Sequence, residues 1–267
     1  MQATACLLEE TPCLTQWYTQ VRVLCRTRAQ VTAATTVPWL EEVTLDFLEV
    51  QGLRDAVEEV HAAGKRAIVA TPRILKPGEQ RLWRFYLGLH ADALLLRSAG
   101  LLHQLTEFGG PGSAVPGAAR LVVPELHGDF SLNAANSVTA TFLLGQSLSR
   151  LTLTHDLNAA QMVELAAALP VGERARLEVI AHQHLPIFHT EHCVFCRFLS
   201  DGNSYKDCGK PCETARVHLR DENSRDHLVL ADMGCRNTVF NAQAQSAAHQ
   251  LDMLKQAGFR CGTVVEL

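Results

Sequence analysis

Short apolar runs recur along the chain, and most of them do not alternate with polar residues. Such runs are typical of strands that are buried on both faces, as in a parallel sheet covered by helices. The runs are Val21–Cys25, Val43–Val50, Arg66–Thr71, Ala91–Arg97, Arg120–Leu126, Arg150–Thr154, Arg176–His182, His227–Ala231 and Cys261–Leu267. Their even spacing over one chain of 267 residues predicts an α/β fold with eight or nine strands.

Amphipathic helices are expected between these runs. Apolar residues repeat at helical spacing from Leu53 to Val60, and Gly64 can end that helix. Asn158 is a candidate N-cap with Gln161 three residues later, as in a capping box. The resulting strand–helix alternation predicts a (β/α)8 TIM-type barrel that spans residues 1–267 as a single domain. An open doubly wound sheet is the alternative, although no G-x-G-x-x-G or Walker sequence occurs.

The composition is that of a globular protein and limits the classes of function and the cellular locations to be considered. Hydrophobic residues make up 47% and charged residues 19%, which is enough for a sizeable core. The net charge of −4 gives no basic footprint for nucleic acid. No apolar stretch approaches the roughly 20 residues of a membrane span, and the acidic N-terminus lacks the basic start of a signal peptide. We therefore expect a cytoplasmic protein without a membrane span, or an organellar one if a leader is missing.

The regular rhythm breaks once, after the seventh run. From about Phe188 to Asp226 no periodicity is visible, and Gly, Asn, Asp, Lys and Cys dominate. A structureless loop of this length is uncommon in a compact domain unless it is functional or held by something other than a core. We therefore predict a cysteine-rich loop, residues 188–236, inserted after the seventh strand of the barrel.

Five of the nine cysteines fall in this loop, at metal-ligand spacings. The order is C-x2-C, x11, C-x3-C, then x22 before Cys235. Two close pairs can supply a closed zinc site from Cys193, Cys196, Cys208 and Cys212. A 4Fe-4S cluster also takes four thiolates, with Cys235 available as a competitor. A set of buried reduced thiols is the remaining interpretation, but so polar a loop is not core-like.

Other polar residues are candidates for catalysis. His182 and His184 follow the run at Leu177–Ala181, at the strand end where barrel enzymes place their chemistry. Together with His189, His192 or Asp232 they could form a catalytic metal site. The alternative is that one histidine packs against the loop and the other is solvated.

The residues that flank the cysteines also have two readings each. Glu191 is a candidate general acid or base, or it only caps the loop. Asp232, Arg236 and Asn237 surround Cys235, where they either orient a substrate and tune a cluster or only close a turn. Glu266 in the last run is either an inward active-site group or a surface strand end.

Peptidase and RNA-binding signatures are weak in the residues themselves. Neither H-E-x-x-H nor G-x-S-x-G occurs. A nucleophilic Cys193 paired with His192 would compete with metal ligation by the same thiolate. Between Thr190 and Arg236 there are seven Lys/Arg and eight Asp/Glu, so the loop is not a basic patch. This charge balance fits a small substrate, or an RNA that another domain recruits, better than RNA binding by the loop alone.

The segment from Leu185 to Asn241 resembles the collagenase-like peptidase family U32. It is most similar to large bacterial and plant members whose motif resembles FHTEHCVF…DCGRPC…ADVGCRNTVFNA. The matching stretches are Phe188–Phe195, Asp207–Cys212 and Ala231–Ala242, and the barrel sequence also resembles the family at Gly128–Ala140 and Leu151–Asn158. The resemblance covers roughly residues 120–267.

This resemblance implies a TIM barrel and a metal cofactor. Several relatives hold a 4Fe-4S cluster on four cysteines and support oxygen-independent hydroxylation of an RNA base or a ubiquinone precursor. Carried onto this chain, the motif makes the ligands Cys193, Cys208, Cys212 and Cys235, with Cys196 as the alternative ligand. Larger relatives have further segments, so a further domain or partner chain absent here is expected to contribute.

Our leading hypothesis is an iron–sulfur barrel enzyme that modifies RNA or a small aromatic substrate similar to a ubiquinone precursor. Its catalytic candidates are His182, His184, Glu191 and Asp232. The first alternative is a collagenase-like peptidase. The second is a non-catalytic interaction module stabilised by zinc.

Overall fold

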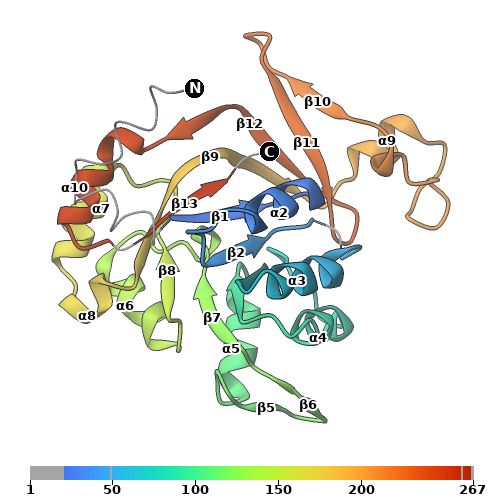
Figure 1. Cartoon of the computed structure of the whole chain (residues 1–267). Helices are drawn as coiled ribbons and strands as arrows, with labels where there is room; N and C mark the ends of the chain where they lie inside the picture. The colour runs from blue at the N-terminus through green and yellow to red at the C-terminus, as the bar shows by residue number, and fades with distance from the viewer. Residues whose placement is uncertain (1–20, 49, 260, 266–267) are drawn as a thin grey trace.

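The computed structural model describes residues 21–48, 50–259 and 261–265, and within them eight parallel strands are hydrogen-bonded in a ring (Figure 1). These strands are β1 (Val21–Cys25), β2 (Glu42–Leu45), β3 (Arg66–Ala70), β4 (Ala93–Leu96), β7 (Glu125–Gly128), β8 (Arg150–Thr152), β9 (Leu177–Thr190) and β13 (Cys261–Val265). Each pairs with the next in chain order, and β13 returns to pair with β1. Every one of these strands therefore has two neighbours.

Helices connect consecutive strands of the ring and cover its outside. They are α2 (Arg28–Thr35), α3 (Leu53–Ala62), α4 (Gln80–Leu87), α5 (Ala99–Glu107), α6 (Ser137–Gly145), α7 (Ala159–Ala167), α8 (Val171–Arg174) and α10 (Leu251–Gln256). The main core lies between them and the strands. The predicted capping box of Asn158 and Gln161 is confirmed at the start of α7. Among the described residues no helix is long and apolar enough to cross a membrane.

The prediction of an α/β barrel is confirmed as a mixed α/β fold with a curled, mostly parallel sheet. The strict (β/α)8 alternation is not established, because in the described part of the chain no helix follows β13. A small hairpin of β5 (Ala114–Val115) and β6 (Ala118–Val122) also stands between α5 and β7. The predicted strand Arg120–Leu126 is thus divided between the hairpin and the barrel. Pro124 lies at the division, where it cannot donate a ladder hydrogen bond.

The predicted loop 188–236 is wrong as a description of local structure, because it carries an antiparallel sheet. Strand β9 is the seventh of the ring, and its outer half leaves the barrel to pair with β12 (Arg236–Ser246). Beyond it lie β11 (Asp226–Asp232), β10 (Val217–Arg220) and the short helix α9 (Val194–Leu199). We call residues 185–246 the antiparallel extension. The apolar run His227–Ala231 therefore belongs to this extension and not to the barrel.

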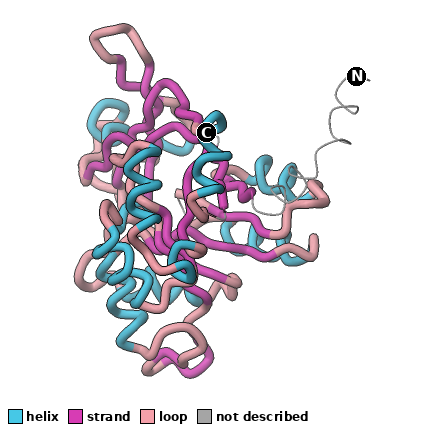
Figure 2. Tube along the Cα trace, turned by 90° about the vertical axis from the view of Figure 1, so that its left-hand side faces the viewer, coloured by secondary structure: helices cyan, strands magenta, loops and turns pink. Residues whose placement is uncertain are grey.

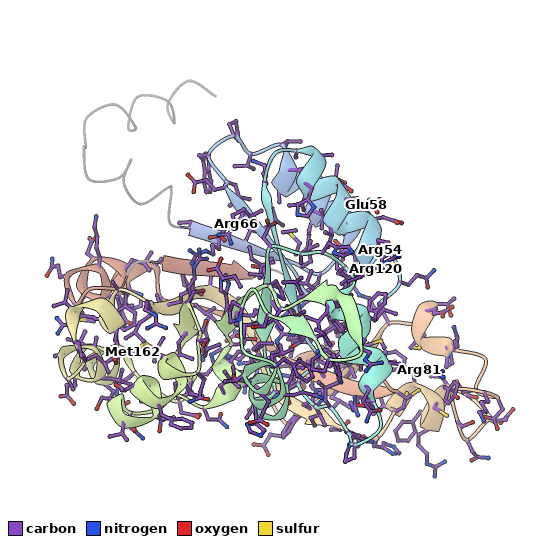
Figure 3. The ribbon with its side chains drawn as sticks, turned by 90° about the horizontal axis from the view of Figure 1, so that it is seen from below. Arg54, Glu58, Arg66, Arg81, Arg120 and Met162 are labelled. Atoms are coloured by element: carbon purple, nitrogen blue, oxygen red, sulfur yellow. The ribbon has the colours of Figure 1, made fainter. Side chains whose placement is uncertain are left out.

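A small core of its own holds the antiparallel extension together. Phe195, Val229 and Val239 are buried in it, and Cys193 and Cys212 pack against them. The hairpins β10–β11 and β5–β6 lie at opposite ends of the molecule (Figure 2). Seen from below, the extension lies on the opposite side of the barrel from α7, which carries Met162 (Figure 3). The extension is thus attached to one side of the barrel through β9 and β12.

Charged residues at the start of the barrel strands form a cluster that closes the N-terminal end. Glu42 at the start of β2 ion-pairs with Arg22 and Arg150, and Glu178 also pairs with Arg22. A second group joins Arg66 to Glu125. Because buried charges are stable only when they are paired, this end is built for stability.

Candidate functional site

All five cysteines of the antiparallel extension line one cavity of about 790 Å³. Cys193 begins α9, and its Sγ accepts a hydrogen bond from the backbone N–H of Cys196 at 3.4 Å. Cys196 hydrogen-bonds through its own thiol to the Gly202 carbonyl at 3.4 Å. Cys208, Cys212 and Cys235 lie on the same cavity wall. The fold thus brings the sequence-predicted cysteines together.

The five thiols are not equivalent. Partial burial raises the pKa of the Cys196 thiol, and the neighbouring thiols of Cys208 and Cys193 raise it further. These three sulfurs are therefore close neighbours. Cys235 is exposed and has a φ of 61°, directly after Gly234 at 77°. A non-glycine residue in this left-handed region is uncommon and is often held there for function.

The donor set of this cavity fits a metal centre bound by thiolates. Thiolates are the ligands that zinc and iron–sulfur clusters take in proteins, and the cavity offers five. The side chains do not converge, since among the described residues no group of three or more His, Cys, Asp and Glu could hold a metal ion as placed. The choice of ligands, including Cys196 against Cys235, stays a prediction.

A second polar site lies at the C-terminal mouth of the barrel, where charged residues directly follow the strands. They are Arg26 after β1, Asp46 after β2, Arg97 after β4 and Asp129 after β7. Arg97 donates to Asp46 at 2.5 Å and to Asp129 at 2.6 Å. Burial opposes ionisation of Asp46, but Arg97 and Arg26 together hold its pKa below the usual range. The mouth therefore carries fixed charges in a rigid, buried arrangement.

Aromatic rings form one wall of this mouth. Phe130 stacks on His155 with ring centroids 3.9 Å apart. Arg73 lies 5.5 Å from the centroid of the Phe130 ring, and Arg26 lies 4.6 Å from that of Phe240. Burial lowers the pKa of His155 to about 4, so its ring is neutral near pH 7. The mouth thus combines flat apolar surface with cationic groups, as many small-molecule sites do.

The structure does not bring His182 and His184 to the barrel mouth. Neither lines the two cavities found there, while Gln183 between them lines the inner one. The pairing of β9 with β13 shifts by one residue between Ile180 and His182. Such a bulge exchanges the inward and outward positions of every residue beyond it. His184 instead hydrogen-bonds to the Asn241 carbonyl at 2.8 Å. Their catalytic role stays a prediction without geometric support.

Glu191 lies at the cysteine cavity but is committed to ion pairs. It contacts Lys76 and accepts from Arg236 at 2.8 Å, and these partners, Lys76 first, lower its pKa. Arg236 is only 2% exposed and also donates to the Ile74 carbonyl at 3.2 Å and to Glu79 at 3.3 Å. This pairing ties the extension to the loop between β3 and α4. An ionised Glu191 held in this way is a positioning group and a poor general acid.

Asp232 joins the two sites, because it lines both the cysteine cavity and the barrel mouth. Burial raises its pKa to about 6. Thr238 Oγ1 lies 3.5 Å from Asp232 Oδ2 and 3.0 Å from His189 Nδ1. Of the predicted catalytic residues, Asp232 is the one whose placement and proton affinity suit acid–base chemistry near neutral pH.

Sequence reasoning missed the charges at the barrel mouth. Arg26, Asp46, Arg97 and Asp129 do not belong to any local motif, and their contacts span 20 to 51 positions. A signal was nevertheless present, since each is a charged residue that directly follows the last residue of a strand. In a parallel barrel such residues meet at the same end. The prediction for Glu266 lies outside the described residues.

A family model agrees with the resemblance noted in the sequence. Among solved structures, the U32 peptidase Mk0906 is 12% identical, covers 93% of this chain and 92% of its own, and has a TM-score of 0.49. The chitinase ChiW from Paenibacillus sp. str. FPU-7 is 10% identical, with a TM-score of 0.36 over 92% of this chain and 40% of its own. No curated protein matches. The model of peptidase family U32 matches residues 43–264, and the chain therefore belongs to that family.

Proposed function

We propose that this U32 protein is a (β/α)8 barrel enzyme that binds an iron–sulfur cluster in the cysteine cavity and modifies a substrate at the barrel mouth. The reaction class that we propose is oxygen-independent hydroxylation of RNA or of a small aromatic molecule. The observation that carries this proposal is the shared wall of the two sites, since Asp232 lines both cavities. A substrate at the mouth would therefore lie next to the centre.

The cluster ligands in this proposal are Cys193, Cys208, Cys212 and Cys235, with Cys196 as the alternative. A bound cluster would supply electron transfer. Asn237 holds the loop that carries the first ligand, because its Oδ1 accepts from the Val194 N–H at 2.7 Å. Asn237 of β12 thus helps to position the segment that carries Cys193.

The protein groups at the mouth have definable tasks. Asp232 can hold or release a proton at Oδ2 near neutral pH, because burial raises its pKa to about 6. The Arg97 bridge between Asp46 and Asp129 keeps the floor of the mouth rigid. The stacked rings of Phe130 and His155 offer a face on which an aromatic substrate could stack.

Each of two other functions is supported by a specific observation. Membership in a peptidase family supports a collagenase-like peptidase, with Cys193 beside His192 in the cavity wall as its nucleophile candidate. The proximity of Cys196 to Cys193 and Cys208 supports a structural zinc site in a non-catalytic module.

Metal content separates these functions. Protein purified without oxygen should be brown, with broad absorption near about 400 nm from thiolate-to-iron charge transfer, and should contain iron. Stoichiometric zinc without iron in such a preparation would favour the interaction module. Cleavage of gelatin that is lost on Cys193→Ser, but kept on the control Cys25→Ser in the buried core, would favour the peptidase.

A further inference from the structure

A small cavity at the barrel mouth is lined by basic side chains, and two of them carry a buried nitrogen without a hydrogen-bond partner among the described residues. Its volume is about 30 Å³, and Arg26, Arg73, Arg97 and His189 line it together with Asp232. On this measure a water-sized atom needs about 10–15 Å³, so the cavity has room for about two such atoms. Two oxygens of one anionic group would fill it.

Arg26 is the first of these donors. Its side chain is only 8% exposed, and its Nε donates to Asp46 at 3.1 Å. Its Nη1 is buried and has no hydrogen-bond partner among the residues that the structure describes. Buried guanidinium N–H groups nearly always have an acceptor, so an acceptor from outside the chain is expected here.

Arg73 supplies the second donor from the opposite wall. It is half-buried and lies over the Phe130 ring, and within the described residues it makes no hydrogen bond of its own. Burial and the nearby Arg97 lower the pKa of Arg73, while Asp129 acts in the opposite direction. A guanidinium in such a place is well suited to an incoming oxyanion.

The balance of charge around the cavity favours an anionic ligand when Asp232 is protonated. Three arginines face the cavity, Asp46 and Asp129 share Arg97 between them, and Asp232 has a pKa of about 6. Burial lowers the pKa of His189, and Arg73 and Arg236 lower it further, while Glu191 raises it. Its Nε2 is also buried without a partner among the described residues.

We propose that the barrel mouth binds the oxyanion group of a small molecule, with Arg26 Nη1 and Arg73 as its donors. The group is either a carboxylate or a phosphate, and Phe130 and Phe240 would flank the rest of the ligand. Both donors come from the barrel, and no cysteine among the described residues lines the cavity. The site therefore goes beyond the proposed cluster chemistry and holds whether or not the cysteines bind iron.

Calorimetric titration of the full chain with sodium benzoate and with inorganic phosphate, in low-salt buffer, tests the proposal. Wild-type protein should bind at least one of them. Arg73→Ala should weaken that binding about tenfold or more, the usual loss for a charged hydrogen bond. Arg26→Lys should also weaken it, because lysine cannot reproduce the planar donor pair. The matched control is Arg81→Ala, an exposed arginine of α4 that should bind like wild type (Figure 3).

Each outcome of the titration either supports or overturns the proposed oxyanion site. Preference for benzoate identifies a carboxylate ligand, and preference for phosphate identifies a phosphate ligand. No heat with either anion up to about 10 mM, or binding that Arg73→Ala leaves intact, would overturn the site. Circular dichroism of every variant shows that it is folded, and if Arg26→Lys fails to fold then Arg73→Ala alone decides. A negative result would leave the metal content unaffected, so the two proposals fail separately.

Discussion

The two ends of the barrel carry similar charged residues in different balance. At the N-terminal end, Arg22, Arg66 and Arg150 face Glu42, Glu125 and Glu178, and all six take part in ion pairs. At the C-terminal mouth, three arginines face Asp46, Asp129 and an Asp232 whose pKa is about 6. Two buried nitrogen atoms there have no hydrogen-bond partner among the described residues, Arg26 Nη1 and His189 Nε2.

This difference indicates how one barrel separates stability from function. The closed, N-terminal end pairs every arginine with a carboxylate, and its buried Glu42 Oε2, which lacks a hydrogen-bond partner among the described residues, lies 3.7 Å from Arg66 Nη1. The open end, the mouth, retains the buried nitrogens Arg26 Nη1 and His189 Nε2 without a hydrogen-bond partner in the described part of the chain. The antiparallel extension belongs to the open end, because it contributes Asp232, His189 and the cysteines there. Substitutions at the two ends of the barrel test this comparison.

The largest effect is expected at the cysteines of the open end. If a cluster follows the family motif, Cys235→Ala should lose nearly all bound iron, while Cys196→Ala should retain it. If zinc uses the two close pairs, Cys196→Ala should lose the metal and on the order of 10 kcal/mol of folding free energy from the extension. Metal analysis of these two matched variants decides, and metal kept without Cys235 but lost without Cys196 would refute our ligand set.

A smaller effect is expected at the closed end. Glu42→Gln should lower the free energy of unfolding by about 1–3 kcal/mol, because it removes the carboxylate that the partly buried Arg22 and Arg150 share, although Arg22 keeps Glu178. The control Glu58→Gln, on the exposed face of α3, should stay within about 0.5 kcal/mol of wild type in urea unfolding (Figure 3).

A substitution at the open end gives the matching measurement of unfolding free energy. Arg73→Ala removes an arginine that makes no hydrogen bond within the described residues, so it should cost less than about 1 kcal/mol. Equal losses for Glu42→Gln and Arg73→Ala would show that the two ends do not differ as we propose.

The two ends should also differ in pH dependence. Burial raises the pKa of Asp232 from 3.8 to about 6, so the folded state binds a proton more tightly than the unfolded state. Stability from this group is therefore present at low pH and falls as pH rises through about 4 to 6. Relative to wild type, Asp232→Asn should gain up to about 3 kcal/mol of unfolding free energy between pH 4 and pH 8.

Glu42 gives the opposite sign at the other end. Burial opposes its ionisation, but Arg22 and Arg150 together lower its pKa. Its contribution is therefore present above its unfolded pKa and is lost as pH falls. Urea unfolding of wild type and both variants from pH 8 to well below the ordinary glutamate pKa of 4.5 tests the contrast. A gain for Asp232→Asn that does not change with pH would refute the assignment to ionisation.

The sequence by itself determined the features that depend on neighbours along the chain. Non-alternating apolar runs predicted the strands of the parallel ring, because strands buried on both faces need such residues. Asn158 and Gln161 predicted a helix start, because a capping box involves only residues three apart. The cysteine spacing predicted thiols within reach of one metal centre, and the five cysteines do line one cavity, because short loops keep close pairs together.

Only the tertiary structure decided which side chains meet across the fold. The shift in β9 turned Gln183, and not His182, toward the barrel interior, and it arises from pairing with β13 about 80 residues away. The run at His227–Ala231 became antiparallel because it pairs with β12 and β10. The cluster of Arg26, Asp46, Arg97 and Asp129 exists because parallel strands end on the same side. Local sequence patterns record burial and periodicity, whereas register and ring closure are set by hydrogen bonds between distant segments.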